Sequence, residues 1–196
     1  MKQAKWWWVG IILLSAGAAW QWGGAYLDEP PERYAAAVEQ RVARELRGVY
    51  ARADVLAEQL GQDSLALFSE LHPEAPYPYY VFRDGELVYW STHLLVPAYD
   101  DLRFVGTHRY VSLPHGRFVA YRRRVGPYEV FFLMSVLRSY ELMNPYLTTG
   151  VNMRLFPRPG FVVSPLESGS AVRAPNGDFI FSLRAVGGTE FGRQRG

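Results

Sequence analysis

The longest amphipathic pattern in the chain runs from residue 32 to residue 61. Its apolar positions follow one another at steps of three or four residues, which is the spacing of one face of an α-helix. Pro31 precedes the pattern and Gly61 closes it. Proline is favoured at the first turn of a helix and glycine at its C-terminal end. The pattern predicts one long helix, whose apolar stripe packs either on its own domain or against a second copy of the helix. The stripe consists of Tyr34, Val38, Val42, Leu46, Val49, Ala53, Leu56 and Leu60.

From residue 79 onward the pattern changes to that of strands. Residues 79–83 and 86–91 flank Asp84-Gly85, a pair typical of two-residue hairpins. A second hairpin is expected around the turn at 114–116. The remaining strands are expected at residues 128–137, an almost continuous apolar run, and at 161–164, 171–174 and 179–183. The predicted fold is therefore α+β, with the long helix packed on an antiparallel sheet of five or more strands. Short helices are expected at 64–71 and 138–147.

Residues 6–27 carry no charged side chain. About 20 apolar residues in a helix span the roughly 30 Å of a bilayer core. Lys2 and Lys5 precede this segment and acidic residues follow it, so the positive-inside rule places the N-terminus in the cytoplasm. We expect a cytoplasmic N-terminus (1–5), an anchor in the inner (cytoplasmic) membrane (6–27), a periplasmic sensor domain (28–186) and a flexible tail (187–196). A cleaved signal peptide is the alternative, because residues 16–18 form an A-x-A site, and it places the domain outside as well.

The charge and the cysteine content limit the classes of function. Lys2 and Lys5 are the only lysines, so the segment after residue 27 carries 19 of the 21 basic residues and all 19 acidic ones. A neutral domain has no general attraction to nucleic acid, and we expect no nucleic-acid partner. The chain has no cysteine, which excludes disulfides, thiol nucleophiles and thiolate metal sites.

A search for catalytic motifs finds none in the sequence. None of the four histidines has a second histidine three or four residues away, and the sequence contains neither a serine elbow nor a phosphate-binding glycine loop. We therefore expect no enzymatic activity, no metal and no cofactor.

A few residues are candidates for binding a ligand. In a strand, Arg122 and Arg124 share one face while Arg123 points to the other, and two guanidinium groups can bind a carboxylate or a phosphate. A solvated sheet face is the alternative. Trp90 could stack on a ligand or pack in the core, and we expect Tyr80 and Phe82 to face the helix.

Residues 80–91 resemble the hairpin F-x-x-G-x-L-x-Y-W-S of the extracytoplasmic sensor regions of membrane histidine kinases, notably those of Bacteroidota-type bacteria. Residues 140–147 resemble the Y-x-x-x-N-x-Y-L helix of the same regions, and residues 176–183 resemble their closing strand. The resemblance implies a Cache- or PAS-like domain that signals across the membrane, and it adds Tyr140 and Asn144 to the ligand-site candidates. The second membrane helix and the kinase core of such receptors have no counterpart in these 196 residues.

The expected function is that of a sensor module of a two-component signalling histidine kinase. Its signal would be a small molecule or a protein, and the module would act as a homodimer at the membrane. The alternative is an anchored structural or assembly protein that binds a protein partner.

Overall fold

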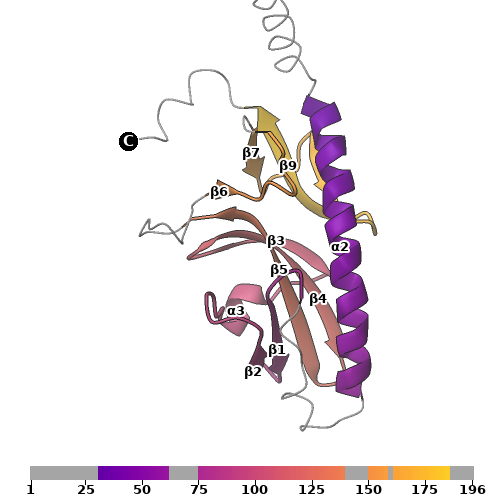
Figure 1. Ribbon diagram of the computed structural model, residues 1–196, viewed down its shortest axis with the longest axis vertical. Coiled ribbons are helices and arrows are strands. Elements are labelled where there is room, and N and C mark those ends of the chain that lie inside the picture. The colour runs from indigo at the N-terminus through magenta and orange to yellow at the C-terminus, as the bar shows by residue number, and fades with distance from the viewer. Residues whose placement is uncertain (1–30, 62–74, 140–149, 159–160, 186–196) are drawn as a thin grey trace, which may run out of the picture.

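The computed structural model describes residues 31–61, 75–139, 150–158 and 161–185. It confirms the α+β class and the long helix, α2, which runs from Pro31 to Gly61. Every residue of the predicted apolar stripe is buried in the domain itself. Glu32 lies in the first turn of α2, where a negative charge interacts favourably with the helix dipole. At 31 residues the helix is about 45 Å long and runs along the whole described domain (Figure 1).

The central sheet is antiparallel and has six strands. Its order is β2-β1-β5-β4-β3, and β6 pairs with the end of β5. Both predicted hairpins are confirmed, and at the first of them Asp84 and Gly85 have φ values of 52° and 86°, the positive values that a type I′ turn requires. The strands are β1 (Tyr79–Arg83), β2 (Glu86–Trp90), β3 (His108–Leu113), β4 (Gly116–Val125), β5 (Tyr128–Arg138) and β6 (Gly150–Val151).

Each face of the central sheet has its own hydrophobic core. Tyr79 and Val81 belong to the core beneath α2, whereas Tyr80 and Phe82 are buried in the core on the opposite face. The expectation that Tyr80 and Phe82 face the helix is therefore wrong. The far core is covered by the short helix α3 (Tyr99–Leu102), whose Leu102 is fully buried. Because both faces are apolar, alternation alone does not show which face meets the helix.

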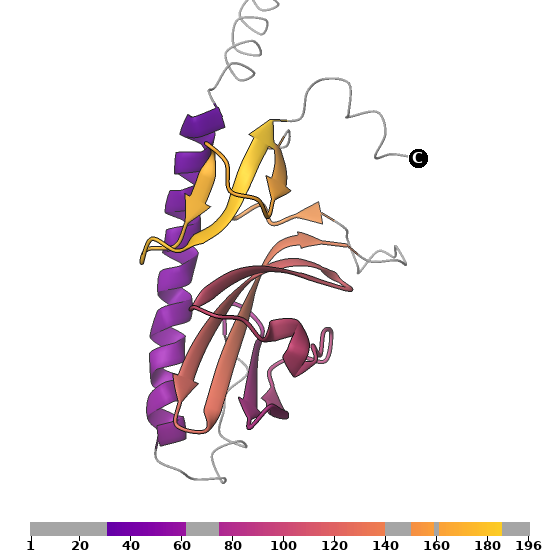
Figure 2. The ribbon, with the colours of Figure 1, turned by 180° about the vertical axis from the view of Figure 1, so that it is seen from behind.

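A second, three-stranded sheet is formed by β7 (Phe161–Ser164), β8 (Ala171–Arg173) and β9 (Phe179–Ala185), in the order β7-β9-β8. The sequence pattern did not separate these strands from the central sheet. Figures 1 and 2 show the two sheets one above the other along the same side of α2. The helix contacts β4 and β5 of the central sheet and β8 and β9 of the second sheet.

The beginning of α2 and the end of β9 lie at the same end of the domain (Figures 1 and 2). Tyr34 stacks on Phe161, with ring centroids 4.0 Å apart, and Phe161 is the register partner of Ala185. The described domain therefore begins and ends in neighbouring positions.

Several predictions fall outside the described residues. These are the anchor at 6–27, the short helix at 64–71, the tail and almost all of the helix expected at 138–147, of which Arg138 belongs to β5. In the described ranges no helix combines the length and the apolarity that crossing a bilayer requires.

Candidate functional site

The structure places two of the predicted ligand residues, Trp90 and Arg122, on one face of the central sheet but does not bring them together. In the strand register Trp90 lies opposite Tyr80, Tyr80 lies opposite Phe131, and Phe131 lies opposite Arg122. Tyr80 and Phe131 are fully buried and stand between the other two. Trp90 is 41% exposed at the edge strand, so it lies at the rim of the far core.

Arg124 points to the same face as Arg122, and Arg123 points to the helix side, as the alternation predicted. Arg123 forms an ion pair with Asp54 of α2 at 3.2 Å. Arg124 Nε lies 2.7 Å from Oε1 of Glu129, whose Oε2 accepts a hydrogen bond from the Tyr99 hydroxyl at 3.1 Å. A shallow groove of about 340 Å³ runs past these three side chains.

The surroundings of Arg122 and Arg124 decide how well they could bind an anion. Glu129 already neutralises Arg124, and the guanidinium of Arg122 lies 5.4 Å from the centre of the Phe104 ring. These two arginines are therefore engaged with groups of the protein itself. Tyr140 and Asn144, the other two candidates, lie outside the described residues.

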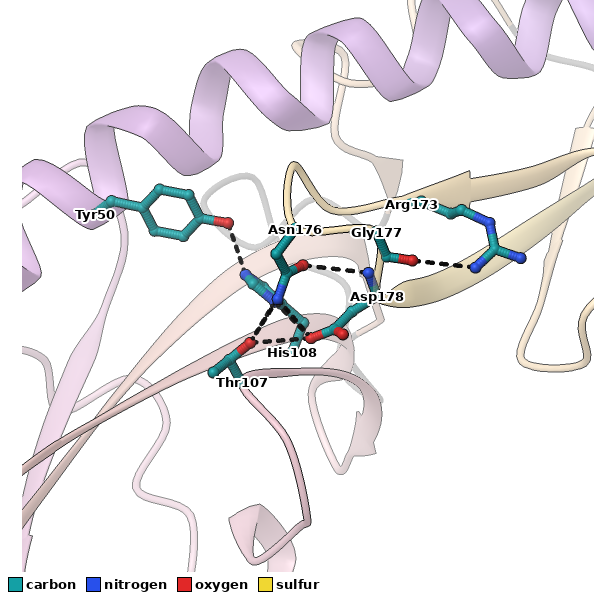
Figure 3. A network of polar contacts seen from close by, with 7 residues as sticks. All are labelled: Tyr50, Thr107, His108, Arg173, Asn176, Gly177 and Asp178. Atoms are coloured by element: carbon teal, nitrogen blue, oxygen red, sulfur yellow. Dashed lines mark hydrogen bonds and ion pairs between the residues drawn. The ribbon is translucent and has the colours of Figure 1, made fainter.

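A cluster of polar side chains that the sequence did not single out connects α2 with both sheets. We call it the polar junction, and Figure 3 shows it. The Tyr50 hydroxyl of α2 lies 2.8 Å from His108 Nε2 at the start of β3. On the other side of the ring, His108 Nδ1 lies 2.9 Å from Thr107 Oγ1 and 3.3 Å from Asp178 Oδ2. Asn176 donates from Nδ2 to Asp178 Oδ2 at 2.8 Å.

The turn between β8 and β9 gives the polar junction its shape. Gly177 has a φ of +86°, which an L side chain rarely adopts. The Asp178 amide donates to Asn176 Oδ1 at 3.2 Å, and Arg173 Nη1 donates to the Gly177 carbonyl at 3.1 Å (Figure 3). These bonds hold the Asp178 carboxylate against His108, whose side chain is only 2% exposed.

The electrostatics of the polar junction favour an uncharged histidine. Burial lowers the pKa of His108, although its hydrogen bond to Asp178 acts in the opposite direction. Burial also raises the pKa of Tyr50 to about 12, so the phenol is protonated at neutral pH and donates to His108 Nε2. The ring then carries its proton on Nδ1, facing Thr107 and Asp178. Hydrogen bonds from Asn176, followed by those from Thr107 and His108, lower the pKa of Asp178 and keep it ionised.

The buried histidine predicts a pH-dependent stability. Because the folded pKa of His108 lies below the ordinary value of 6.5, the unfolded chain binds the proton first as the pH falls. The free energy of unfolding should therefore decrease below about pH 6.5, with a slope of at most about 1.4 kcal/mol per pH unit for one proton. Urea unfolding between pH 5 and 8 measures this slope.

The variant His108→Gln should lose this part of the slope. His115→Gln, at the exposed turn between β3 and β4, is the matched control and should keep it. Equal slopes in the wild type and in His108→Gln would contradict an uncharged, buried His108.

The polar junction is a network of hydrogen bonds. No group of three or more histidine, aspartate or glutamate side chains in the described part of the chain could hold a metal ion. No local pattern in the sequence indicated the polar junction, because Tyr50 and Asp178 lie 58 and 70 residues from His108.

Comparison of the chain with protein-family models, with curated proteins and with solved structures found no match. The function proposed below therefore rests on the geometry of the chain and on the resemblance of its motifs.

Proposed function

We propose that this chain is the membrane-anchored, extracytoplasmic sensor module of a two-component signalling histidine kinase, with the kinase core outside these residues. The anchor at 6–27, the periplasmic position of the domain and a homodimer are parts of this proposal. The ligand or protein signal would act on the folded domain, and α2 would carry the change toward the membrane.

The fold supports a Cache- or PAS-like domain. The motif resemblance implies a long N-terminal helix packed on an antiparallel sheet, and α2 and the central sheet have this arrangement. The strands of this sheet follow the order β2-β1-β5-β4-β3. This agreement concerns the fold alone. The sensor role is therefore argued from the contacts that α2 makes with the two sheets.

The observation that carries the proposal is the position of α2 against both sheets. The helix contacts the central sheet and the second sheet, and it starts beside Phe161, next to the end of β9. A displacement of one sheet against the other therefore has to move the helix as well. Packed interfaces switch between discrete arrangements rather than deform continuously, which suits a helix that transmits a signal.

The proposed movement of α2 would act on the polar junction, which joins α2 to both sheets. His108 belongs to the central sheet, Tyr50 to α2 and Asp178 to the turn of the second sheet. A shift of any one element by more than about 1 Å takes the donors and acceptors beyond hydrogen-bond distance. The junction therefore couples the three elements.

Distances between spin labels test the proposal, and the absence of native cysteine makes the labelling specific. Labels are placed at Val55 on α2, which is 44% exposed, and at Leu166 in the connection between β7 and β8 of the second sheet, which is 75% exposed. A thermal-shift screen of the full chain against carboxylates, amino acids, sugars and phosphates first identifies a ligand. Binding at 100 to 1,000 times Kd should stabilise the fold by about 3–4 kcal/mol, and the label distance should then change by roughly 1–2 Å or more.

A second pair of labels is the control for this experiment. Glu86 and Ser112 lie on opposite edge strands of the central sheet and are both exposed, so their distance should stay constant. A ligand that stabilises the protein without moving α2 would contradict the sensor proposal. A domain that responds to no compound and keeps one label distance would favour the anchored structural or assembly protein.

A further inference from the structure

We infer that the signal-receiving site of this chain is a notch beside β5 that binds a small oxyanion, such as a carboxylate. This inference rests on the proposed function, and it names the chemical class of the ligand. It differs from the sequence-based candidates, because Trp90, Arg122 and Arg124 do not line the notch.

The notch arises where β5 changes its neighbour. β1 pairs with β5 as far as Tyr79 and Phe132. On the same side of β5, β6 begins to pair only at Val151 and Leu137. Among the strands of the described residues, none lies beside β5 on this side between these two pairs, whereas β4 pairs with β5 along the other side. A groove of about 380 Å³ lies in this interval. Its lining includes Tyr77, Ser135, Arg138, Asn152 and Arg154.

The charged side chains among the described lining residues of the notch are both basic. Arg138, at the end of β5, and Arg154 both line it and both are exposed. Within the described ranges neither of them forms an ion pair with an acidic side chain, in contrast to Arg123 and Arg124. Guanidinium groups bind carboxylates and phosphates through two parallel hydrogen bonds, so this pair fits an oxyanion.

The segment that carries Arg154 is ordered by hydrogen bonds within the protein, without a ligand. Asn152 donates from Nδ2 to the Ser135 carbonyl at 2.8 Å, and its Oδ1 accepts from the Arg154 amide at 3.0 Å. Both ends of the Asn152 side chain are therefore used to fix the segment that carries Arg154. Such prior ordering lowers the entropy that binding costs.

Glu45 of α2, an acidic residue that contacts Tyr77 in the lining of the notch, is held by the protein itself. The Tyr77 hydroxyl donates to Glu45 Oε2 of α2 at 2.7 Å. Burial and this contact with Glu45 raise the pKa of Tyr77, so the phenol stays protonated and keeps the bond, while the charge of Arg154 acts in the opposite direction. Glu45 does not line the groove.

The same contacts connect the notch with the elements that we propose to move. Tyr77 reaches α2 through Glu45. On the other side, the Phe156 amide donates to the Asn152 carbonyl at 2.9 Å, and the buried Phe156 ring lies 6.0 Å from that of Phe181 in β9. An oxyanion bound by Arg138 and Arg154 therefore touches a segment between α2 and the second sheet.

The experiment measures oxyanion binding to the full chain by calorimetry. The probes are succinate, acetate and inorganic phosphate, and uncharged succinamide is the control for shape. The variants Arg138→Gln and Arg154→Gln should each weaken the affinity for the best oxyanion about tenfold or more, and rising salt should weaken it further. Arg47→Gln, on the exposed side of α2, is the matched control and should leave the affinity unchanged.

Each outcome bears on one of the two proposals. Equal affinity in Arg138→Gln, Arg154→Gln and wild type, equal binding of succinamide, or no oxyanion binding at millimolar concentration would overturn the notch as the ligand site. If a different compound moved the labels on α2 in these variants as in the wild type, the sensor proposal would stand without the notch. Oxyanion binding that depends on both arginines but leaves the label distance unchanged would confirm the site and contradict its signalling role.

Discussion

Replacing Leu46 by alanine should lower the free energy of unfolding by about 3 kcal/mol, within the range of about 2–5 kcal/mol found for buried leucines. Leu46 lies in the middle of the apolar stripe of α2 and has no exposed surface. Its loss removes apolar burial and leaves a cavity between the helix and the domain. The helix itself should persist, because alanine has the highest intrinsic helix propensity. Urea unfolding followed by circular dichroism measures the change in the midpoint.

The neighbouring residue provides the control for Leu46. Arg47 is exposed on the other side of α2, and Arg47→Ala should change the free energy of unfolding by no more than about 0.5 kcal/mol. Similar effects at both positions would contradict the packing of the apolar stripe on this domain. In that case the alternative of a stripe that packs only between two copies of the helix would gain support.

Replacing Gly116 by alanine should destabilise the domain by about 3 kcal/mol or more, which is beyond the usual cost of overpacking. Gly116 opens β4, and a Cβ atom there would lie 2.1 Å from the carbonyl oxygen of Leu137 and 3.1 Å from the Cα of Arg138. Both neighbours are backbone atoms of β5, so no side chain can rotate away. The φ of +141° adds strain for any L side chain. Thermal and urea unfolding of the purified variant measure the loss.

A substitution at Gly106 distinguishes the strain of a positive φ from the steric clash with β5. It also has a positive φ, of +96°, but no atom lies within 4 Å of the position of its Cβ. Gly106→Ala should therefore show the conformational strain alone, about 1–2 kcal/mol. If Gly116→Ala lost no more stability than Gly106→Ala, the close approach of β4 and β5 would not be as described.

The two substitutions and the proposed sensing mechanism concern the same parts of the domain. Leu46 holds α2 on the domain, and Gly116 holds β4 against the end of β5, next to Arg138 of the notch. A loss of stability at either place should also reduce the coupling between ligand and helix, because an element that is already loose transmits little free energy.

The features that the sequence predicted correctly depend on local chemistry. The stripe of α2 follows from a period that neighbouring turns of one helix share. The hairpin at Asp84-Gly85 follows from two residues that tolerate positive φ. The alternation of Arg122, Arg123 and Arg124 follows from the pleat of a strand, and the ion pair between Arg123 and Asp54 agrees with it.

Only the tertiary structure decided the remaining features. β1 is apolar on both faces, so its pattern could not show that Tyr79 and Val81, rather than Tyr80 and Phe82, meet the helix. The strands at the C-terminal side formed a sheet of their own, because strand pairing depends on partners elsewhere in the chain. The polar junction and the notch assemble residues far apart in sequence, such as Tyr77 and Arg154. No local pattern encodes such proximity, since it arises only when strand order and register bring these side chains together.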